Sequence, residues 1–450
     1  MSKVIKLRKG LNIRIAGGAE KIFIKPNQAE YFAIKPTDFH GLTPKMLVKE
    51  GELVKAGTAL FHDKNTPEIL FTSPVSGTVK EIIRGERRQI LEVIIKADIE
   101  HEYELFTHGD PKNLSKDQVI ENLLKSGLWP LIIQRPYGIV ANPNDTPKSI
   151  FISAFDSAPL APDLDFTIQD DAKEFQIGIN ALSKLTSGKI HLNINAEFNP
   201  SKVFINTEGV QLNSIIGPHP AGNVGVQIHH IDPINKGDVV WTLNPQDVVA
   251  IGRLFSKGIY DASRIVALTG SEVKERRYYK VMIGSQVTEL IKNNLEQENV
   301  RIISGNVLTG TQISEKGFLG FHDTQLTVIP EGNHYEFLGW ALPGMNKFSA
   351  SKTFFSSLFP KKEYKLDTNY NGAERAFVMT GQYEKVVPMD ILPQHLVKAI
   401  MVEDIDKMEQ LGIYEVIEED LALCEYVCTS KIEVQKILRN GLNLMKKEMS

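Results

Sequence analysis

The chain has 450 residues, of which 42% are hydrophobic and 24% are charged, so it is long enough to bury several cores and to divide into about three or four domains. Its 51 lysines and arginines stand against 55 aspartates and glutamates, which gives a formal net charge of -4. We therefore predict no nucleic-acid partner, because binding a phosphate backbone needs a concentrated basic face.

The sequence also lacks segments that would place a chain across a membrane. No apolar run approaches the roughly 18 residues of a spanning helix. Residues Met1–Lys9 alternate charged and apolar side chains and form no signal-peptide core. Two cysteines provide no disulfide framework, which is typical of a reducing compartment. We predict no direct membrane span, so that any membrane association comes through partner subunits.

Residues 1–100 are predicted to form a β region. Turn glycines such as Gly51, Gly57 and Gly77 are separated by short strand-like pieces. This pattern resembles the biotinyl/lipoyl barrel-sandwich hybrid, in which two short sheets enclose a small core. The resemblance places Lys64 on the hairpin tip that carries a modified lysine in that fold. Because Lys64 lacks the residues that flank modified lysines, we predict a scaffold or docking domain.

Residues 101–260 are predicted to form a Rossmann-like α/β domain with a partly parallel sheet. Ser115 and Gln118 form a capping box that begins a helix over Ser115–Ser126, and Gly127 ends it. Strands are predicted over Ile150–Ala154, Ile190–Ile194, Val203–Ile205 and Val239–Leu243, and helices over Ala172–Leu185 and Pro245–Lys257.

The most distinctive segment of this domain is GPHPAGNVG, Gly217–Gly225. Its three glycines and two prolines exclude a helix or a ladder strand, so we predict a shaped loop whose backbone approaches something closely. In α/β sheets such loops gather beyond the strand ends, where ligands bind. Further along, Asn244 and Pro245 fit the cap and first position of a helix, and Gln246 and Asp247 place acceptors near its positive end.

Together with VWTLNPQDVVAIGRLF at Val240–Phe255, the loop resembles the A subunits of the sodium-translocating NADH:quinone reductases, a family of bacterial respiratory proteins. The resemblance runs through most of the chain. Further segments match that family in the same order, namely Lys9–Gly17, Phe71–Val79, Arg301–Gly310, Val328–Gly332 and Glu419–Cys424.

The resemblance implies a function that belongs to a whole complex. Such a complex passes electrons from NADH through flavins and iron–sulfur centres to a quinone, and exports Na⁺. The implied place of this chain is the cytoplasmic side of the bacterial inner membrane, peripheral and docked on the other subunits, especially membrane subunits near the quinone-reducing end. The isolated subunit is then expected to be inactive.

The α/β domain is also similar in architecture to the NADH-binding flavoprotein subunit of complex I and to the C subunit of the Rnf complex, where a glycine-rich loop holds flavin phosphate. This chain contains no G-x-G-x-x-G, and its segment Gly305–Gly310 is followed by Thr311 in place of a P-loop lysine. At the place of the flavin loop it has Gly127–Pro130 and Arg135–Tyr137, which are bulky. We predict that this subunit binds no cofactor itself.

Residues 261–365 are predicted to form a smaller unit, with a strand over Arg264–Leu268, a turn at Gly270 and a helix over Val287–Leu295. It resembles the ubiquitin-like ligand-binding module, SLBB, of the same relatives. The stretch from Phe318 to Phe359 is predicted to be irregular. Its aromatic residues either line a quinone groove or pack between domains, and packing is the favoured interpretation; they are Phe348, Phe354, Phe355 and Phe359.

Residues 366–450 are predicted to be helical, over Pro393–Glu403, Asp404–Leu411 and Leu421–Cys428, with a last helix that starts at a Ser430 and Glu433 box and runs through Leu444. The Rnf relative carries iron–sulfur cysteines in the corresponding region. Cys424 and Cys428 lie one turn apart, but a cluster needs four thiolates, so we predict two buried core thiols.

No catalytic residue and no metal site is predicted. The residues weighed as a metal set match no common zinc pattern; they are His219, His229, His230 and Asp232. His219 is the candidate proton donor to a quinone oxygen. The competing interpretation is a loop histidine that hydrogen-bonds to neighbouring backbone. The predicted quinone or interface residues are Gly217, Pro218, His219, Pro220, Gly222 and Gly225.

Two other functions stay open at this point. One is a free-standing flavin-dependent NADH dehydrogenase, which the absorption spectrum of the purified chain would reveal. The other is a lipoyl-type carrier, which its intact mass would reveal.

Overall fold

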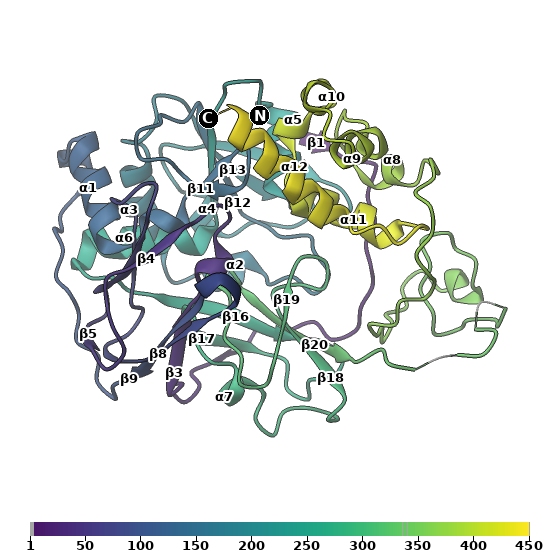
Figure 1. Ribbon diagram of the computed structural model, residues 1–450, viewed down its shortest axis with the longest axis horizontal. Coiled ribbons are helices and arrows are strands. Elements are labelled where there is room, and N and C mark those ends of the chain that lie inside the picture. The colour runs from purple at the N-terminus through teal and green to yellow at the C-terminus, as the bar shows by residue number, and fades with distance from the viewer. Residues whose placement is uncertain (1–3, 335, 340, 450) are drawn as a thin grey trace.

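The computed structural model describes residues 4–334, 336–339 and 341–449, which form sheets of seven, six, four and three strands. Figure 1 shows the α/β region with α3 and α6 on the left, the C-terminal helices at the upper right, and the six-stranded sheet below. Short 3-10 helices connect the larger elements; they are η1 (Pro36–Asp38), η2 (Glu86–Arg88), η3 (Pro111–Asn113), η4 (Trp129–Leu131), η5 (Phe355–Leu358) and η6 (Ile413–Glu415).

The seven-stranded sheet forms the α/β domain. Its strands, in order across the sheet, are β1 (Val4–Lys6), β14 (Gln211–Ile216), β13 (Ile190–Asn195), β12 (Ser149–Ser153), β15 (Val240–Leu243), β10 (Ile133–Arg135) and β11 (Ile139–Val140). Neighbours from β1 to β15 are parallel, whereas β10 and β11 are antiparallel. The predicted partly parallel sheet is therefore confirmed.

Local hydrogen bonds set the ends of two helices in this domain. In α1 (Lys116–Ser126), the Ser115 hydroxyl accepts from the Gln118 N–H at 3.2 Å, and the Gln118 side chain accepts from the Ser115 N–H at 2.9 Å. Gly127 ends the helix with a left-handed φ of 75°. The same device begins α6 (Pro245–Lys257), where Asn244 and Asp247 form the box. Both predicted caps are confirmed.

Helix α3 (Ala172–Leu182) packs closely on α6. A Cβ at Gly178 would lie 2.1 Å from the Val248 carbonyl oxygen, and a Cβ at Gly252 would lie 1.8 Å from the Glu174 carbonyl oxygen. Glycine at these two positions lets the two backbones meet. The helix is shorter than the predicted Ala172–Leu185, although Leu185 is still fully buried.

One predicted strand is a helix. Residues Val203–Ile205 belong to α4 (Lys202–Ile205), whose first turn is capped by the Ser201 hydroxyl, which accepts from the Val203 N–H at 3.2 Å. The Phe204 ring packs edge-on against Phe175 of α3 at 5.6 Å. Packing onto α3 outweighs the weak β preference of a three-residue apolar run. The parallel strand of this region is β14.

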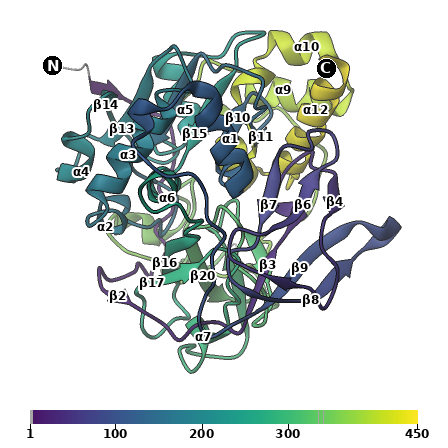
Figure 2. The same cartoon turned by 90° about the vertical axis from the view of Figure 1, so that its left-hand side faces the viewer.

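The N-terminal region forms the predicted barrel-sandwich hybrid. One sheet contains β3 (Tyr31–Ile34), β9 (Ile90–Ala97), β8 (Gly77–Arg84) and β5 (Leu53–Val54), and the other contains β4 (Pro44–Met46), β6 (Ala59–Asp63) and β7 (Leu70–Thr72). Lys64 is exposed in the turn that follows β6. Figure 2 shows the long β8–β9 hairpin projecting from this region.

The first residues of the chain leave the barrel-sandwich region and join two other sheets. Strand β1 pairs with β14 of the α/β domain, and β2 (Phe23–Ile24) pairs with β17 of the six-stranded sheet. The N-terminal segment therefore contributes strands to two sheets whose other strands come from later parts of the sequence.

The six-stranded sheet contains β19 (Thr311–Ile313), β18 (Val300–Ser304), β20 (Gln325–Pro330), β16 (Ser263–Thr269), β17 (Tyr278–Met282) and β2. Its helix α7 (Thr288–Ile291) is shorter than the predicted Val287–Leu295. Asn293 takes a positive φ of 58°, and Leu295 forms a bridge with Val273. This pairing replaces the last helical turn.

Residues 336–339 and 341–365 form an irregular lobe at the right of Figure 1. The favoured prediction of packing between domains is wrong for two of its aromatic residues, because Phe355 is 61% exposed and Phe359 is 51% exposed. Phe348 is half-buried and packs against the core that the N-terminal segment, the α/β domain and the C-terminal helices share, as the favoured prediction expects. Phe354 is half-buried as well. The phenylalanine content predicts apolar surface, but the backbone path decides which rings face outward.

The C-terminal region is helical, as predicted. It contains α8 (Tyr383–Val386), α9 (Pro393–Met401), α10 (Ile405–Gln410), α11 (Glu418–Val427) and α12 (Val434–Met449). The predicted box at Ser430 and Glu433 is wrong, since the Ser430 hydroxyl donates to the Ala376 carbonyl and α12 starts at Val434. Among the described residues, no helix has the length and apolar character to cross a bilayer.

Candidate functional site at the glycine and proline loop

The loop Gly217–Gly225 leaves the carboxyl end of β14 and enters α5 (Val224–Ile231). Because β14 is parallel to β13 and β12, the loop lies at the strand edge where α/β sheets place ligands. Its last two residues, Val224 and Gly225, already belong to the helix, so the irregular part ends at Asn223.

The loop is packed against the same chain. A Cβ at Gly217 would lie 2.7 Å from the Leu7 Cβ, and a Cβ at Gly222 would lie 2.5 Å from the Ser157 backbone nitrogen. The close backbone approach that the glycines predict is therefore observed, and it is made to residues near the N-terminus and after β12.

His219 lies at the centre of these contacts. Its ring Nδ1 is hydrogen-bonded to the Ser157 hydroxyl at 3.0 Å, and the same hydroxyl accepts from the Gly222 N–H at 2.8 Å. The His219 N–H donates to the Asn12 side chain at 2.8 Å, and its carbonyl accepts from Leu11 at 2.8 Å. The ring of His219 thus bonds to the Ser157 side chain, whereas the competing interpretation expects neighbouring backbone as its partner. The backbone of His219 fastens the loop to Asn12 and Leu11.

The electrostatics of His219 follow from its burial. The side chain is 4% exposed, and burial lowers the pKa of the imidazole to about 4. The ring is therefore neutral at pH 7. A general acid works best with a pKa near the working pH, so the free chain does not provide that condition at this position.

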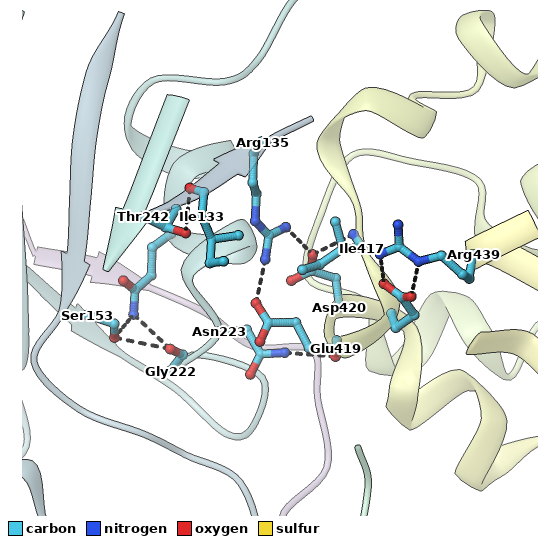
Figure 3. Close-up of polar contacts among 12 residues, drawn as sticks. Ile133, Arg135, Ser153, Gly222, Asn223, Thr242, Ile417, Glu419, Asp420 and Arg439 are labelled. Atoms are coloured by element: carbon cyan, nitrogen blue, oxygen red, sulfur yellow. Dashed lines mark hydrogen bonds and ion pairs between the residues drawn. The ribbon is translucent and has the colours of Figure 1, made fainter. Parts of the chain in front are cut away.

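The loop ends against a buried ion pair that the sequence did not reveal (Figure 3). Arg135, 1% exposed at the end of β10, donates from Nη1 to Asp420 Oδ2 at 2.6 Å and from Nη2 to the Glu419 carboxylate. A Cβ at Gly225 would lie 2.4 Å from both Arg135 Nη1 and Asp420 Oδ2. Glycine at this position makes room for the ion pair.

The ion pair joins the α/β domain to the start of α11. Asp420 also accepts from the Ile417 N–H at 3.0 Å, and the Asn223 side chain donates to the Glu419 carbonyl at 2.8 Å. Within the described residues, Arg135 Nε and Asp420 Oδ1 have no hydrogen-bond partner. The junction is therefore held mainly by charge, with part of its hydrogen-bonding capacity unused.

The charges of this junction shift one another. Burial acts to lower the pKa of the Arg135 guanidinium, but the carboxylates of Asp420 and Glu419 outweigh it and raise that pKa. Burial, opposed by Arg135 and reinforced by Asp420, raises the pKa of Glu419 to about 7. Since 38% of the Glu419 side chain is exposed, water opposes this upward shift.

Next to the ion pair of Arg135, a second ion pair fastens α12 to α11. Arg439 donates from Nη2 to Glu418 at 2.6 Å and from Nη1 to the Tyr137 carbonyl at 2.7 Å. Burial acts to raise the pKa of Glu418, but Arg439 overcomes this effect and lowers it. The segment Arg135–Tyr137 is thus bound by side chains of both α11 and α12.

Below the loop, a buried amide fixes α5 to the sheet. The Gln227 side chain donates to the Ser153 hydroxyl at 2.8 Å and to the carbonyl of Ala221 at 3.1 Å, and it accepts from Asn193 at 2.8 Å. Loop, strand ends and helix therefore form one hydrogen-bonded unit.

The four residues considered as metal ligands have separate partners in the structure, and His219 is the one bonded to Ser157. His229 Nε2 accepts from the Asp390 N–H at 3.0 Å, so its Nδ1 carries the hydrogen toward Glu415 at 2.6 Å. His230 Nε2 lies 2.7 Å from the Pro388 carbonyl, and Asp232 pairs with Lys148 at 2.7 Å. The described part of the chain holds no group of three or more metal-ligating side chains.

Cys424 and Cys428 are both buried and unpaired by disulfide. Burial raises the pKa of the Cys424 thiol well above its usual value, so this thiol is protonated at pH 7. The backbone N–H of Ile432 approaches the Cys428 sulfur at 3.4 Å. These are the surroundings of core thiols.

Gln246 and Asp247, in the first turn of α6, also connect domains. The Gln246 side chain exchanges two hydrogen bonds with the backbone of Ile265 in β16, at 2.7 and 2.9 Å. Asp247 forms a buried ion pair with Arg264. Asp247 caps α6 as predicted, whereas Gln246 fastens that helix to the six-stranded sheet.

A shallow depression of about 310 Å³ lies at the opposite edge of the seven-stranded sheet. It is lined by Ser183, Gly188, Lys189, Ile190, Gly209, Val210 and Gln211. Because these residues precede or begin β13 and β14, the depression is far from the loop along both strands.

Three residues of the junction, Arg135, Glu419 and Asp420, were not predicted from the sequence. The signal that was present is a charged residue inside the apolar run Leu131–Arg135, and an acidic triplet at the start of a helix. Neither pattern predicts which residue the charge pairs with, because Arg135 and Asp420 are 285 positions apart.

Three segments of the chain match described protein families. Residues 5–98 match the NqrA N-terminal barrel-sandwich hybrid domain, residues 114–260 the NqrA second alpha/beta domain, and residues 265–315 the NQRA C-terminal domain.

The chain is also similar along its whole length to proteins named as the A subunits of Na(+)-translocating NADH-quinone reductases. The protein of Photorhabdus laumondii is 39% identical over 448 residues, and that of Pasteurella multocida is 39% identical over 450, each covering 99% of this chain and 100% of the relative. That of Rhodopirellula baltica is 38% identical over 454 residues, covering 99% and 98%. A solved NAD+-reducing [NiFe]-hydrogenase covers 76% of this chain and 62% of its own at 10% identity, with a TM-score of 0.39, too low to support an inference.

Proposed function

This chain belongs to the family of A subunits of the Na(+)-translocating NADH-quinone reductases, and we propose that it works as the peripheral subunit of such a complex. The complex would transfer electrons from NADH to quinone and couple this transfer to Na⁺ export. The chain would dock on the membrane subunits from the cytoplasmic side, near the quinone-reducing end. The observation that carries the proposal is similarity over 99% of the chain to full-length relatives that bear this name.

We propose that no flavin, NADH or iron–sulfur cluster binds to this chain, so that redox chemistry occurs on other subunits. The support is local. Trp129 lies in the segment that the sequence resemblance assigns to the flavin phosphate loop; it is fully buried and donates from its indole nitrogen to the Ala141 carbonyl at 2.7 Å. Arg135 is engaged by Asp420, and the chain has two thiols where a cluster needs four.

Within this function, the loop Gly217–Gly225 is proposed to keep the C-terminal helices at a fixed place on the α/β domain. The contacts of Gly225 and Asn223 with the start of α11 support this role. Contact of quinone or of a partner subunit with His219 stays a prediction.

The test of the function uses the host cell. An affinity-tagged chain is purified from detergent-solubilised membranes, and the material is assayed for NADH-driven quinone reduction with and without Na⁺. We expect the chain to carry other subunits and a Na⁺-stimulated activity with it. Removal of its gene should abolish quinone reduction in membranes. A chain that purifies alone, with membranes that keep full activity after its removal, would contradict the proposal.

A further inference from the structure

The lobe formed by residues 336–339 and 341–365 carries an unusual concentration of exposed apolar side chains. Seven of the 24 large hydrophobic residues exposed in the described structure fall in these 29 residues. They are Phe337, Leu338, Leu342, Met345, Phe355, Leu358 and Phe359, with exposures from 44% to 89%. Single exposed apolar residues are ordinary, but a concentration of this kind marks a contact surface.

Some aromatic residues of the lobe make internal contacts, and Phe348 also packs against the main body of the molecule. The Phe348 ring packs against Tyr364 at 5.7 Å, and the Lys347 ammonium lies over the Phe354 ring at 5.7 Å. The Ser356 hydroxyl donates to the Lys347 carbonyl. The inner aromatic residues are used to fold the lobe, while the outer ones face away from it.

The base of the lobe is fastened to the rest of the molecule. The Gly332 N–H donates to the Thr368 hydroxyl at 2.7 Å, and that hydroxyl donates to Glu331 at 2.6 Å. Tyr364 pairs with the N-terminal segment through its N–H, which donates to the Arg14 carbonyl at 2.8 Å. Figure 1 shows the lobe standing out from the body beyond β18 and β20.

The charge of the lobe is opposite to that of the whole chain. Residues 336–365 contain five lysines and two glutamates, but Lys347 pairs with Glu336 and Lys365 with Glu272 of the main body. The remaining charged residues are Lys352, Lys361, Lys362 and Glu363, a formal net charge of +2, whereas the chain as a whole carries -4. Lys352 and Lys361 are exposed, and neither makes an ion pair with a described residue. Exposed aromatic residues interleaved with unpaired lysines form a surface that suits an apolar layer lying behind anionic groups.

We propose that this lobe rests on the anionic surface of a lipid bilayer, with its outer phenylalanine and leucine side chains in the headgroup boundary and its lysines at the phosphates. This inference rests on the proposed function, which places the chain beside a membrane. The backbone stays outside the hydrocarbon, since irregular backbone cannot satisfy its polar groups there.

Charge favours lipid over a protein partner as the occupant. The cytoplasmic loops of membrane proteins carry an excess of lysine and arginine, which repels a basic lobe. The cytoplasmic leaflet is rich in anionic lipid, which attracts it. The lobe would thus orient the peripheral subunit on the membrane that holds its partners.

The test uses the purified full chain and sedimentation with vesicles of phosphatidylglycerol and phosphatidylcholine, or of phosphatidylcholine alone. We expect binding to the anionic vesicles that weakens as NaCl is raised. The triple variant Phe355→Ser, Leu358→Ser, Phe359→Ser should bind at least about tenfold more weakly. Lys352→Glu with Lys361→Glu should remove most of the preference for phosphatidylglycerol.

The matched control is Ile99→Ser with Leu105→Ser, which removes two side chains that are 95% and 83% exposed outside the lobe. This control should bind like the unchanged chain. The proposal is overturned if the unchanged chain ignores anionic vesicles, or if the triple variant binds them equally well. A triple variant that loses only its assembly with membrane subunits in detergent would assign the lobe to a protein partner and also overturn it.

Failure of this inference and failure of the proposed function are distinguishable. Vesicle binding is measured without other subunits, whereas the function is tested by what the tagged chain carries out of its host membrane.

Discussion

At the residue scale, His219 shows how a buried side chain is used by its loop. Its ring nitrogen, its N–H and its carbonyl all have partners, on Ser157, Asn12 and Leu11. A histidine held in this way is expected to affect stability through its protonation, because its pKa is about 4 in the folded chain.

The first prediction concerns the pH dependence of stability. Between pH 4 and 6.5 the unfolded chain binds a proton at His219 that the folded chain does not, so the free energy of unfolding rises with pH and is lost on acidification. Moving from pH 7.5 to 5 should cost about 2 kcal/mol through this group. Urea unfolding followed by the fluorescence of Trp129 and Trp241, which are fully buried in this domain, measures it.

His219→Gln is the comparison for that measurement. The variant should be less stable at pH 7.5 but should lose about 2 kcal/mol less than the unchanged chain on acidification. Equal losses in both proteins would show that His219 does not titrate in this range.

The second prediction separates a role in quinone reduction from a role in the junction. If His219 serves quinone, His219→Ala should lower quinone reduction by the assembled complex, while assembly and NADH oxidation by artificial acceptors survive. If the loop is a joint or docking surface, His219→Ala should do little. Gly225→Val should then release the C-terminal helices or the whole subunit, because its side chain displaces the ion pair of Arg135 and Asp420.

The cost of Gly225→Val should be about 3 kcal/mol or more, the usual effect of breaking a buried ion pair. Increased proteolysis of the C-terminal region and loss of the subunit from the complex measure it. Gly18→Val is the control, since a Cβ there meets nothing within 4 Å. If His219→Ala and Gly225→Val both leave assembly and turnover intact, the loop is only a connection.

At the element scale, α11 is the point where the C-terminal region meets the α/β domain. Its first residues, Glu418 to Asp420, bind Arg439 and Arg135. Further along the helix, the side chains of Leu421 and Cys424 are fully buried. One short helix thus contributes both charge and apolar packing to the junction.

The third prediction concerns the two thiols at the end of α11. Replacing Cys424 and Cys428 with alanine should cost about 1 to 2 kcal/mol at each site by leaving small cavities, and valine at these sites should cost less. Quinone reduction by the assembled complex should remain near that of the unchanged protein. Loss of electron transfer in a complex with normal amounts of this subunit would show that the thiols hold a cofactor.

At the scale of the whole molecule, the domains are connected by segments from distant parts of the sequence. Strands β1 and β2 join two sheets, Arg264 and Asp247 join the α/β domain to the six-stranded sheet, and Arg135 joins it to α11. We expect the subunit to behave as one scaffold that presents its surfaces in a fixed arrangement.

The fourth prediction is that the purified chain is colourless and has an unmodified mass. The physical reasons are the absence of a glycine-rich flavin loop from the sequence, the presence of only two thiols, and a Lys64 hairpin that lacks the flanking residues of modified lysines. Visible absorption and intact mass spectrometry measure it, with Lys64→Arg as the control for modification. Bound flavin near one per chain, or a lipoyl-sized increase in mass that Lys64→Arg removes, would contradict it.

Features that depend on neighbours within a few positions could be predicted from the sequence alone. The caps of α1 and α6, the glycine that ends α1 and the general alternation of strands and helices follow from local hydrogen bonds and periodicity. Strand β14, which leads into the loop, was not among the predicted strands. The ordered motifs indicated the family for the same reason, since each is a contiguous stretch.

What those stretches contact depends on the folded chain. Residues Val203–Ile205 form a helix because Phe204 packs on α3, and Phe355 and Phe359 face solvent because of the path of the lobe. The partner of Arg135 lies 285 residues away, and the stability of a buried charge depends entirely on such a partner. A sequence records which residues are charged or apolar, but burial and pairing arise when distant segments fold together.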